Sequence, residues 1–258
     1  MSDLEGKVAL VTGAGRGIGR AIATVLAHKG MLIGVNDIDE TLAENVAKTL
    51  GGEGGRALAL PASVGNKTDV AGIFDQIESE LGPLWLLVNN AGVLPTGPTA
   101  ELSEEAWDDA FEVDAKGVFL CSQAAIRKMI PRRQGRIVNI SSVAGMIVRI
   151  AEISYCSAKA AVIHFSRCLA VEMAPYGITV NCVCPGMTST EMLNKSVVDR
   201  GLDLDAMVEL IPDGRMAKEE EHAHLVAYFA SEEAAHVTGQ VVAVDGAQSL
   251  YLPFMMKH

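Results

Sequence analysis

A tyrosine and a lysine four residues apart, Tyr155 and Lys159, are the side chains of this chain most suited to proton chemistry. In a helix, residues at this spacing lie one above the other on the same face. A free phenol has a pKa of about 10, and a neighbouring ammonium stabilises the phenolate and lowers that pKa. Ser142 follows the apolar run 136–141 and offers a hydroxyl to the same substrate oxygen. The three residues predict a site that moves a proton on and off an alcohol oxygen.

A glycine-rich loop near the N-terminus gives this pair its weight, because a tyrosine and a lysine at this spacing are by themselves common on protein surfaces. The run 7–28 has the pattern of an apolar strand, a turn rich in glycine, and a helix with aliphatic residues at helical spacing. Glycines let the backbone approach a diphosphate, and a helix N-terminus provides free N–H groups. The alternative is a tight connection without a ligand. We favour dinucleotide binding, with contacts at Gly13, Arg16, Gly17, Ile18 and Gly19.

Asp37 directly follows the second predicted strand, 32–36. Its spacing in the sequence from the glycine loop is the one expected for a residue that binds the adenine ribose. A carboxylate there accepts hydrogen bonds from the ribose hydroxyls and repels a 2′-phosphate, which favours NAD over NADP. Arg16 is a cation that can partly offset this repulsion. The alternative for Asp37 is a solvated strand end.

Together these motifs resemble the short-chain dehydrogenase/reductase family, and the resemblance covers nearly the whole chain. It is carried by the loop 12–19, the run 89–92, the set Ser142, Tyr155 and Lys159, the segment 185–190 and the run 244–246. The resemblance implies that Ser142, Tyr155 and Lys159 are catalytic, and that Tyr155 and Lys159 also contact the cofactor. It implies further cofactor contacts at Asn90, Ala91, Gly92, Pro185, Gly186, Thr188 and Thr190.

Two positions depart from the family pattern. Asp114 stands where many members carry an asparagine that orders a water between the lysine and solvent, so Asp114 is a candidate member of the catalytic proton relay. Ser63, before Val64, stands where members usually place an aspartate that meets the adenine amino group. A serine hydroxyl can accept that hydrogen bond, but more weakly than a charged group.

The substrate residues are expected between the serine and the tyrosine and after residue 187: Arg149, Glu152, Met187 and Met192. These stretches are similar to the 2,3-dihydro-2,3-dihydroxybenzoate dehydrogenases, and Arg149 can pair with a substrate carboxylate. Alternatively, Arg149 pairs with Glu152 or with a neighbouring subunit. The predicted reaction is hydride transfer between NAD(H) and a secondary alcohol or ketone, such as a cyclic dihydrodiol or a hydroxy acid.

Other functions remain open from the sequence. A polyol, sugar or hydroxysteroid dehydrogenase is the broader alternative. A 3-oxoacyl-acyl-carrier-protein reductase is less favoured, because such reductases usually prefer NADPH and Asp37 disfavours it. A remote alternative is a scaffold that binds NAD without turnover.

Composition limits the partners. The 258 residues include 21 basic and 32 acidic side chains, and the net charge of −11 argues against nucleic acid or an anionic membrane. No leader pattern begins the sequence, and no apolar run reaches the roughly 20 residues of a membrane span. Five cysteines predict buried, reduced thiols and a cytoplasmic location. No metal-ligand spacing is found, so we expect no metal. His222 and His224 follow three glutamates and are interpreted as a solvated helix face.

Seven strand-like runs alternate with helical patterns, which predicts an α/β fold. We expect a single Rossmann-like doubly wound domain over 1–258, a seven-stranded parallel sheet with helices on both faces, in which the irregular segment 188–214 is a substrate lid. Asn66 and Ser103 are expected helix N-caps. The predicted helices 106–129 and 155–174 carry long apolar stretches that one sheet cannot cover, and family members pair these helices, so we expect a homotetramer. The stretches include Val118, Phe119, Leu120, Val162, Ile163, Phe165 and Leu169.

Overall fold

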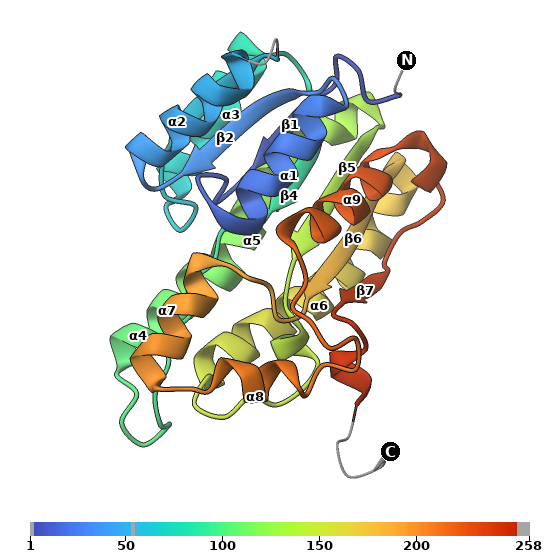
Figure 1. Cartoon of the computed structure of the whole chain (residues 1–258). Coiled ribbons are helices and arrows are strands. Elements are labelled where there is room, and N and C mark those ends of the chain that lie inside the picture. Colours follow the sequence, from blue (N-terminus) through green and yellow to red (C-terminus); the bar gives the residue numbers. More distant parts are fainter. Residues whose placement is uncertain (1–2, 53–54, 252–258) are drawn as a thin grey trace.

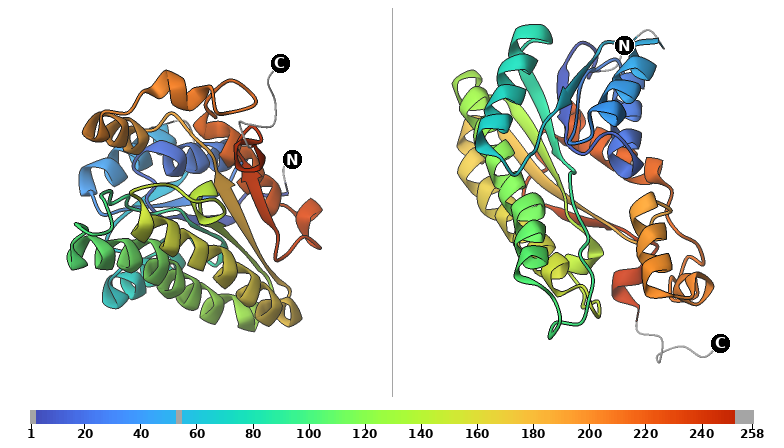
Figure 2. Two further views of the ribbon diagram at one scale, coloured as in Figure 1. Left: turned by 90° about the horizontal axis from the view of Figure 1, so that it is seen from below. Right: turned by 90° about the vertical axis from the view of Figure 1, so that its left-hand side faces the viewer.

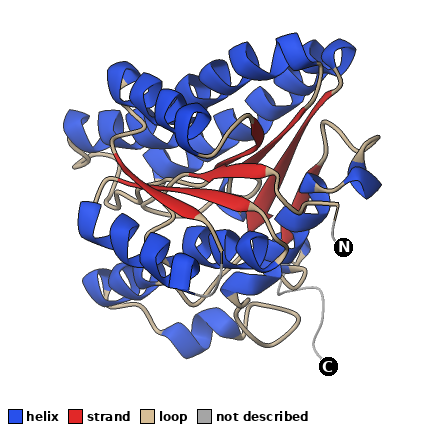
Figure 3. Ribbon diagram, turned by 90° about the horizontal axis from the view of Figure 1, so that it is seen from above, coloured by secondary structure: helices blue, strands red, loops and turns tan. Residues whose placement is uncertain are grey.

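One parallel sheet organises the protein (Figure 1). The computed structural model describes residues 3–52 and 55–251, in which seven strands form a sheet of order β3-β2-β1-β4-β5-β6-β7. Figure 3 shows the strands as one twisted layer with helices on both sides, so the predicted doubly wound α/β fold is confirmed. The strands are β1 (Val8–Val11), β2 (Leu32–Asp37), β3 (Ala57–Pro61), β4 (Leu84–Asn89), β5 (Gly135–Ile140), β6 (Ile178–Pro185) and β7 (Val241–Val244).

The central strands are buried on both faces. In β1, Ala9 and Val11 belong to one hydrophobic core, and Val8 and Leu10 to the other. Strands covered on both sides are continuous apolar runs, which is why the sequence pattern found them. One core packs under α1 (Gly17–His28), α2 (Glu40–Gly52) and α9 (Glu219–Ala230), and the other under α3 (Lys67–Glu80), α5 (Gly117–Met129) and α6 (Ile153–Met173).

Two predicted helix starts are confirmed by their capping bonds. Asn66 Oδ1 accepts hydrogen bonds from the backbone N–H groups of Thr68 and Asp69. Ser103 Oγ accepts one from Ala106 N–H and begins α4 (Glu104–Phe111). The predicted helix 106–129 is interrupted, because α4 continues through a π-helical turn, Glu112–Lys116, into α5. Single π-helical turns are often found at functional sites, and this one contains Asp114.

The segment 188–214 is more regular than we expected. It contains α7 (Glu191–Arg200) and α8 (Leu204–Val208), and side chains of Thr190 and Asp203 cap their first turns. Figure 2 shows these helices beyond the carboxyl end of β6, far from the N-terminus. Ligands of doubly wound sheets bind outside the carboxyl ends of the strands, at the point where the strand order reverses. Here that point lies between β1 and β4.

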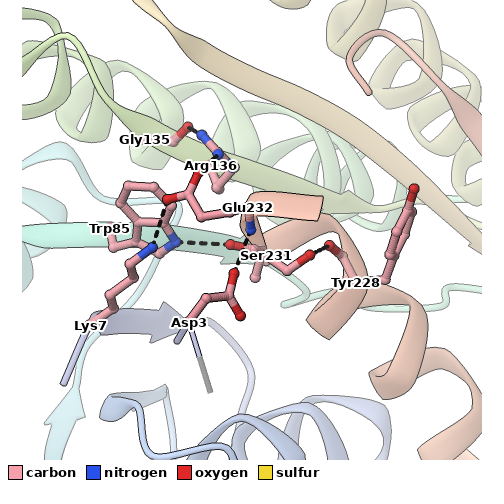
Figure 4. Close-up of polar contacts among 9 residues, drawn as sticks. Asp3, Lys7, Trp85, Gly135, Arg136, Tyr228, Ser231 and Glu232 are labelled. Carbon is pink, nitrogen blue, oxygen red and sulfur yellow. Dashed lines mark hydrogen bonds and ion pairs between the residues drawn. The ribbon is translucent and has the colours of Figure 1, made fainter. Parts of the chain in front are cut away.

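A cluster of charges around Trp85 lies at the opposite, amino end of the strands (Figure 4). The Lys7 ammonium and the Arg136 guanidinium lie over the Trp85 ring, at 3.5 Å and 4.6 Å from its centroid. Glu232 pairs with both cations, at 2.9 Å and 3.2 Å. Trp85 Nε1 donates to Ala230 O at 3.0 Å. The cluster joins β1, β4 and β5 to the end of α9, at the end of the sheet away from the site.

Most of the apolar residues expected to need a partner subunit are covered within the chain. Phe119 on α5 is 44 % exposed and Phe165 on α6 is half-buried, but the other five are buried within the chain. The premise of the assembly prediction is therefore largely wrong. The expected burial of the thiols is confirmed for Cys121, Cys182 and Cys184, whereas Cys156 is half-buried and Cys168 is exposed. The covered residues are Val118, Leu120, Val162, Ile163 and Leu169.

Candidate active site

The glycine loop between β1 and α1 forms a tight backbone cradle. Gly13 and Gly17 have φ of 60° and 56°, which favours glycine. A Cβ on Gly19 would lie 2.1 Å from the Gly13 carbonyl oxygen, so only glycine lets α1 begin so close to the strand. Arg16, in extended conformation, precedes the helix, and the first N–H groups of α1 are available to a diphosphate. The residues present fit the dinucleotide expected from the sequence.

Asp37 closes the cradle on one side. One oxygen of its carboxylate accepts from Gly15 N–H at 2.9 Å and the other from Asp39 N–H at 3.1 Å. A Cβ on Gly15 would lie 2.7 Å from Asp37 Oδ2, so loop and carboxylate are packed together. These two bonds fix the carboxylate at the carboxyl end of β2, and it is not the freely solvated strand end that was the alternative.

The run after β4 borders the cradle on its other side. The Thr12 hydroxyl accepts from the N–H groups of Asn90 and Ala91, at 2.9 Å and 3.1 Å. The Asn90 amide donates to the carbonyls of Thr12 and Gly13, both at 3.0 Å. These bonds hold the two loops at the point where the strand order reverses. Val64 is buried nearby, and Ser63 Oγ accepts from Gly65 N–H at 3.3 Å.

The predicted catalytic residues meet at the carboxyl ends of β4 and β5. Lys159 Nζ lies 3.7 Å from Asp114 Oδ1 and 5.6 Å from the centroid of the Tyr155 ring. It also donates to Ile140 O at 3.3 Å. Ser142 starts a short 3₁₀ turn after β5, where its Oγ accepts from Ala144 N–H at 3.1 Å, and its side chain acts to lower the pKa of Tyr155. Ser142, Lys159 and Asp114 are all buried.

Burial and the neighbouring charges shift the pKa of Tyr155 in opposite directions. Burial raises the pKa of Tyr155 above its ordinary value, the Lys159 charge lowers it, and the Asp114 charge raises it. Burial disfavours the charged form of Lys159, but Asp114 and Tyr155 outweigh this, so the pKa of Lys159 is raised and it stays protonated. A further positive charge beside the ring is therefore needed before the phenolate forms near neutral pH.

Asp114 is held rigidly at the end of this set. Its Oδ1 accepts from Val93 N–H at 2.9 Å, while Oδ2 is buried without a hydrogen-bond partner among the described residues. Burial raises the pKa of Asp114. A Cβ on Gly92 would lie 2.8 Å from Asp114 Oδ1 and 3.2 Å from Lys159 Nζ, so Gly92 lies directly against this pair.

The segment after β6 lies against the end of β7 and against the glycine loop. Gly186 N–H donates to Val244 O at 3.0 Å, and a Cβ there would lie 2.6 Å from Asp245 Cβ. A Cβ on Gly17 would lie 3.8 Å from the Thr190 side chain. The structure thus brings the predicted segment 185–190 to the cofactor cradle.

His222 was misinterpreted from the sequence. It lies in the first turns of α9 and is fully buried, with Nε2 2.8 Å from Thr188 Oγ1. Only His224 lies on the exposed side of the helix. The preceding glutamates suggested a solvated face, and Glu219 and Glu221 do pair with the arginines Arg20 and Arg215. The His222 side chain instead contacts Thr188, after the end of β6.

Arg149 and Glu152, both predicted substrate residues, pair with each other. Arg149 Nε lies 3.2 Å from Glu152 Oε2, and Glu152 is buried. A residue that the sequence reasoning missed, Arg200 at the end of α7, binds Glu152 Oε1 at 2.6 Å and Ile150 O at 3.1 Å. Two cations thus share one carboxylate, which leaves a net positive charge beside Tyr155. No local pattern marks Arg200, because its partners are distant in sequence.

Helix α7 is held at both ends. At its start Glu191 pairs with Arg16 of the glycine loop at 3.3 Å, and at its end Arg200 pairs with Glu152. The helix therefore spans from the cofactor cradle to the segment before Tyr155. Met192 is partly exposed on α7, whereas Met187 is buried below it.

A family model described as short chain dehydrogenase matches residues 7–201. The chain belongs to the short-chain dehydrogenase family. It is an oxidoreductase of this family, acting on hydroxyl or keto groups with a nicotinamide cofactor. The predicted family resemblance is confirmed.

Its relatives in this short-chain dehydrogenase family act on different substrates. The chain is 39 % identical over 244 residues to a 3-oxoacyl-[acyl-carrier-protein] reductase of Vibrio cholerae, covering 95 % of this chain and 98 % of that one. It is 38 % identical over 254 residues to a 2,3-dihydro-2,3-dihydroxybenzoate dehydrogenase of Bacillus subtilis, covering 96 % and 97 %. A gluconate 5-dehydrogenase of Burkholderia cenocepacia, in complex with NADP and tartrate, matches with a TM-score of 0.90 and 33 % identity, covering 96 % and 97 %.

The described residues contain neither a candidate metal site nor a membrane-spanning helix. No group of three or more His, Cys, Asp or Glu side chains there is arranged to hold a metal ion. In the same part of the chain, no helix has the length and apolar character needed to cross a membrane.

Proposed function

We propose that this short-chain dehydrogenase oxidises a secondary alcohol, or reduces the ketone, with NAD(H) and with Tyr155 as the proton-transferring residue. The observation that carries the proposal is the buried group in which Lys159, Ser142 and Asp114 surround the phenol, with Lys159 Nζ 5.6 Å from the ring centroid. The bound nicotinamide supplies hydride chemistry and, when oxidised, a positive charge. We take the whole chain, 1–258, as one domain.

Each residue of the group has a distinct role in the proposed mechanism. In oxidation, the Tyr155 phenolate takes the hydroxyl proton while hydride leaves the alcohol carbon, and in reduction the phenol returns that proton. Lys159 lowers the pKa of Tyr155 and would contact the nicotinamide ribose. Ser142 donates to or accepts from the substrate oxygen and so fixes it beside the phenol. Asp114 links Lys159 to the path by which protons reach solvent.

The cofactor would lie across the carboxyl ends of the strands, from Asp37 to Lys159. Asp37, already fixed by two backbone N–H groups, would accept from the adenine ribose hydroxyls and repel a 2′-phosphate, so we propose NAD as the preferred cofactor. Arg16 offsets this repulsion little, because it pairs with Glu191. The other proposed contacts are Gly13, Gly17, Ile18, Gly19, Ser63, Val64, Asn90, Ala91, Gly92, Tyr155, Pro185, Gly186, Thr188 and Thr190.

We propose that the substrate carries an anionic group, which Arg149 binds. Arg149 Nε forms an ion pair with Glu152 Oε2 at 3.2 Å, without hydrogen-bond geometry, and its terminal nitrogens have no partner among the described residues. A guanidinium held in this way presents a planar pair of donors that suits a carboxylate. Met187 and Met192 would line the apolar part of the pocket, and 188–214 would act as the lid.

A panel of cyclic diols, polyols, hydroxysteroids and hydroxy acids, each assayed with NAD, tests this function. We expect a carboxylated cyclic diol or hydroxy acid to give the highest kcat/KM. Arg149→Leu is expected to raise the KM for that substrate about tenfold with a smaller effect on kcat, because it removes a charge-assisted bond. The same substitution should leave a neutral analogue unaffected. An equal loss for charged and neutral substrates would contradict the anionic site.

The charge of Asp114 is expected to set the pH dependence of oxidation. Because that charge raises the pKa of Tyr155, Asp114→Asn should lower this pKa and move the acidic limb of the kcat/KM profile to lower pH. Asparagine can still accept from Val93 N–H, so NAD affinity should stay nearly constant. The profile is measured from about pH 6 to 10, around the tyrosine reference pKa. An unchanged limb would place Asp114 outside the proton path, and a shift to higher pH would reverse the proposed sign.

We propose that the protein works in the cytoplasm as a homotetramer. Trp107 on α4, Phe119 on α5 and Val171 on α6 remain exposed on neighbouring helices, and a two-fold axis through α5 and α6 would cover such residues. Light scattering at micromolar concentration should give about four times the chain mass, and Phe119→Glu should lower it. A monomeric mass for the unsubstituted protein would contradict this assembly.

A further inference from the structure

A buried histidine from a distant part of the fold holds the hydroxyl of Thr188. Thr188 Oγ1 donates to Gly186 O at 3.0 Å and lies 2.8 Å from His222 Nε2. The His222 side chain is 0 % exposed. A hydroxyl can donate one hydrogen bond and accept two. Gly186 and His222 use two of these three bonds, so they decide whether the remaining one donates to a ligand or accepts from it.

The hydrogen-bond partners fix the tautomer of His222. A carbonyl oxygen only accepts, so the Thr188 proton is directed to Gly186 O, and His222 Nε2 must carry the hydrogen that it shares with Thr188. Nδ1 is then the unprotonated ring nitrogen, and it has no partner among the described residues. Burial lowers the pKa of His222 to about 4, so the ring is neutral. Thr188 keeps one lone pair that can only accept.

The backbone of Thr188 is held independently of the histidine. Residue 188 forms an isolated parallel bridge with Ala217, and Ala217 N–H donates to Met187 O at 2.8 Å. Met187 N–H donates to the Gln248 side chain at 3.1 Å. Loss of the His222 donor should therefore loosen the hydroxyl, which keeps only its bond to Gly186 O, without moving the segment.

We infer that His222 is a positioning residue, which holds the Thr188 hydroxyl as an acceptor for the amino group of the nicotinamide carboxamide. The inference rests on the proposed role of Thr188 in cofactor binding. Its consequence is selectivity for an amide. A cofactor analogue with an acetyl group in place of the carboxamide has no N–H to donate, and would leave the fixed lone pair of Thr188 unpaired.

Binding of three ligands to the whole protein, measured by calorimetry, tests this inference. The ligands are NADH, its reduced acetylpyridine analogue, and ADP-ribose, which lacks the nicotinamide. We expect the unsubstituted protein to bind the analogue about tenfold more weakly than NADH, as expected for one unpaired buried group. His222→Phe should bring this ratio close to one and leave the ADP-ribose affinity unchanged.

Three further variants separate positioning from packing. His222→Gln keeps an N–H donor and should restore most of the ratio. His224→Phe, on the exposed side of the same helix, should change nothing. In a Thr188→Val background, His222→Phe should have no further effect, because the hydroxyl that it positions is gone. His222→Leu replaces His222→Phe if the phenylalanine variant does not give a cooperative thermal transition.

Two results would overturn the inference. A ratio that stays near tenfold in both His222→Phe and His222→Leu would mean that the histidine does not direct the hydroxyl. Equal weakening of NADH and ADP-ribose would mean that it only supports the fold. If the unsubstituted protein bound neither NADH nor ADP-ribose, the proposed function itself would fail. That result comes from the unsubstituted protein alone, so it is distinguishable from a failure of the His222 inference.

Discussion

Tyr155→Phe is expected to lower kcat by about 10²-fold or more, the scale of loss for a positioned acid or base. The substitution removes only the phenolic oxygen and leaves the ring in place. Lys159, buried with its ammonium 5.6 Å from the ring centroid, and Ser142 would then have no phenol to act through. NADH affinity, measured by titration, should change less than about twofold, because Tyr155 is one of many proposed cofactor contacts and its ring stays in place.

The same substitution at another tyrosine is the matched control. Tyr228 lies on α9 and is 42 % exposed, so Tyr228→Phe should keep full activity. Substantial turnover by Tyr155→Phe would show that another group moves the proton. The nearest alternatives would be Ser142 and Lys159, which double substitutions would then distinguish.

Asp37→Asn is expected to narrow the preference for NAD over NADP by about tenfold or more in kcat/KM. The carboxylate is fixed by Gly15 and Asp39 N–H groups, so it cannot move away from a 2′-phosphate. Two like charges a few ångströms apart at a protein surface repel by a few kcal/mol, and a tenfold ratio corresponds to about 1.4 kcal/mol. Asparagine removes the charge and keeps one oxygen, which can still accept from one of the two N–H groups.

Asp39→Asn is the control for this prediction, because Asp39 is exposed and lies two residues further on. It should leave the cofactor ratio unchanged. Equal use of NAD and NADP by the unsubstituted protein would contradict the ribose assignment. Arg16→Ala would then show whether the glycine-loop cation, released from Glu191, binds the phosphate.

The sequence was most informative where local patterns determine structure. The central strands β1, β4, β5 and β6 are buried along their whole length, because helices cover both faces of the parallel sheet there. Asn66 and Ser103 cap helices through bonds to residues two or three positions away. The glycine loop is equally local, since its backbone conformation requires glycine at fixed positions.

Contacts between distant residues were not predictable. Arg200 reaches Glu152 from 48 residues away, and His222 reaches Thr188 from 34 residues away. The neighbours of His222 are glutamates, so its local context suggested solvent. The apolar stretches on α5 and α6 suggested a missing partner, because the sequence does not show how much of each helix surface is covered by the rest of the chain. In each case tertiary packing overrode the local pattern.

The measurement that most directly tests the central claim is the stoichiometry of one turnover reaction. The alcohol with the highest kcat/KM in the panel is incubated with the protein and NAD, and ketone and NADH are quantified together. We predict equal amounts of both, with one proton released per NADH and no ketone formed without NAD. Tight NAD binding without NADH from any alcohol of the panel would contradict catalysis and favour a protein that binds the cofactor without turnover.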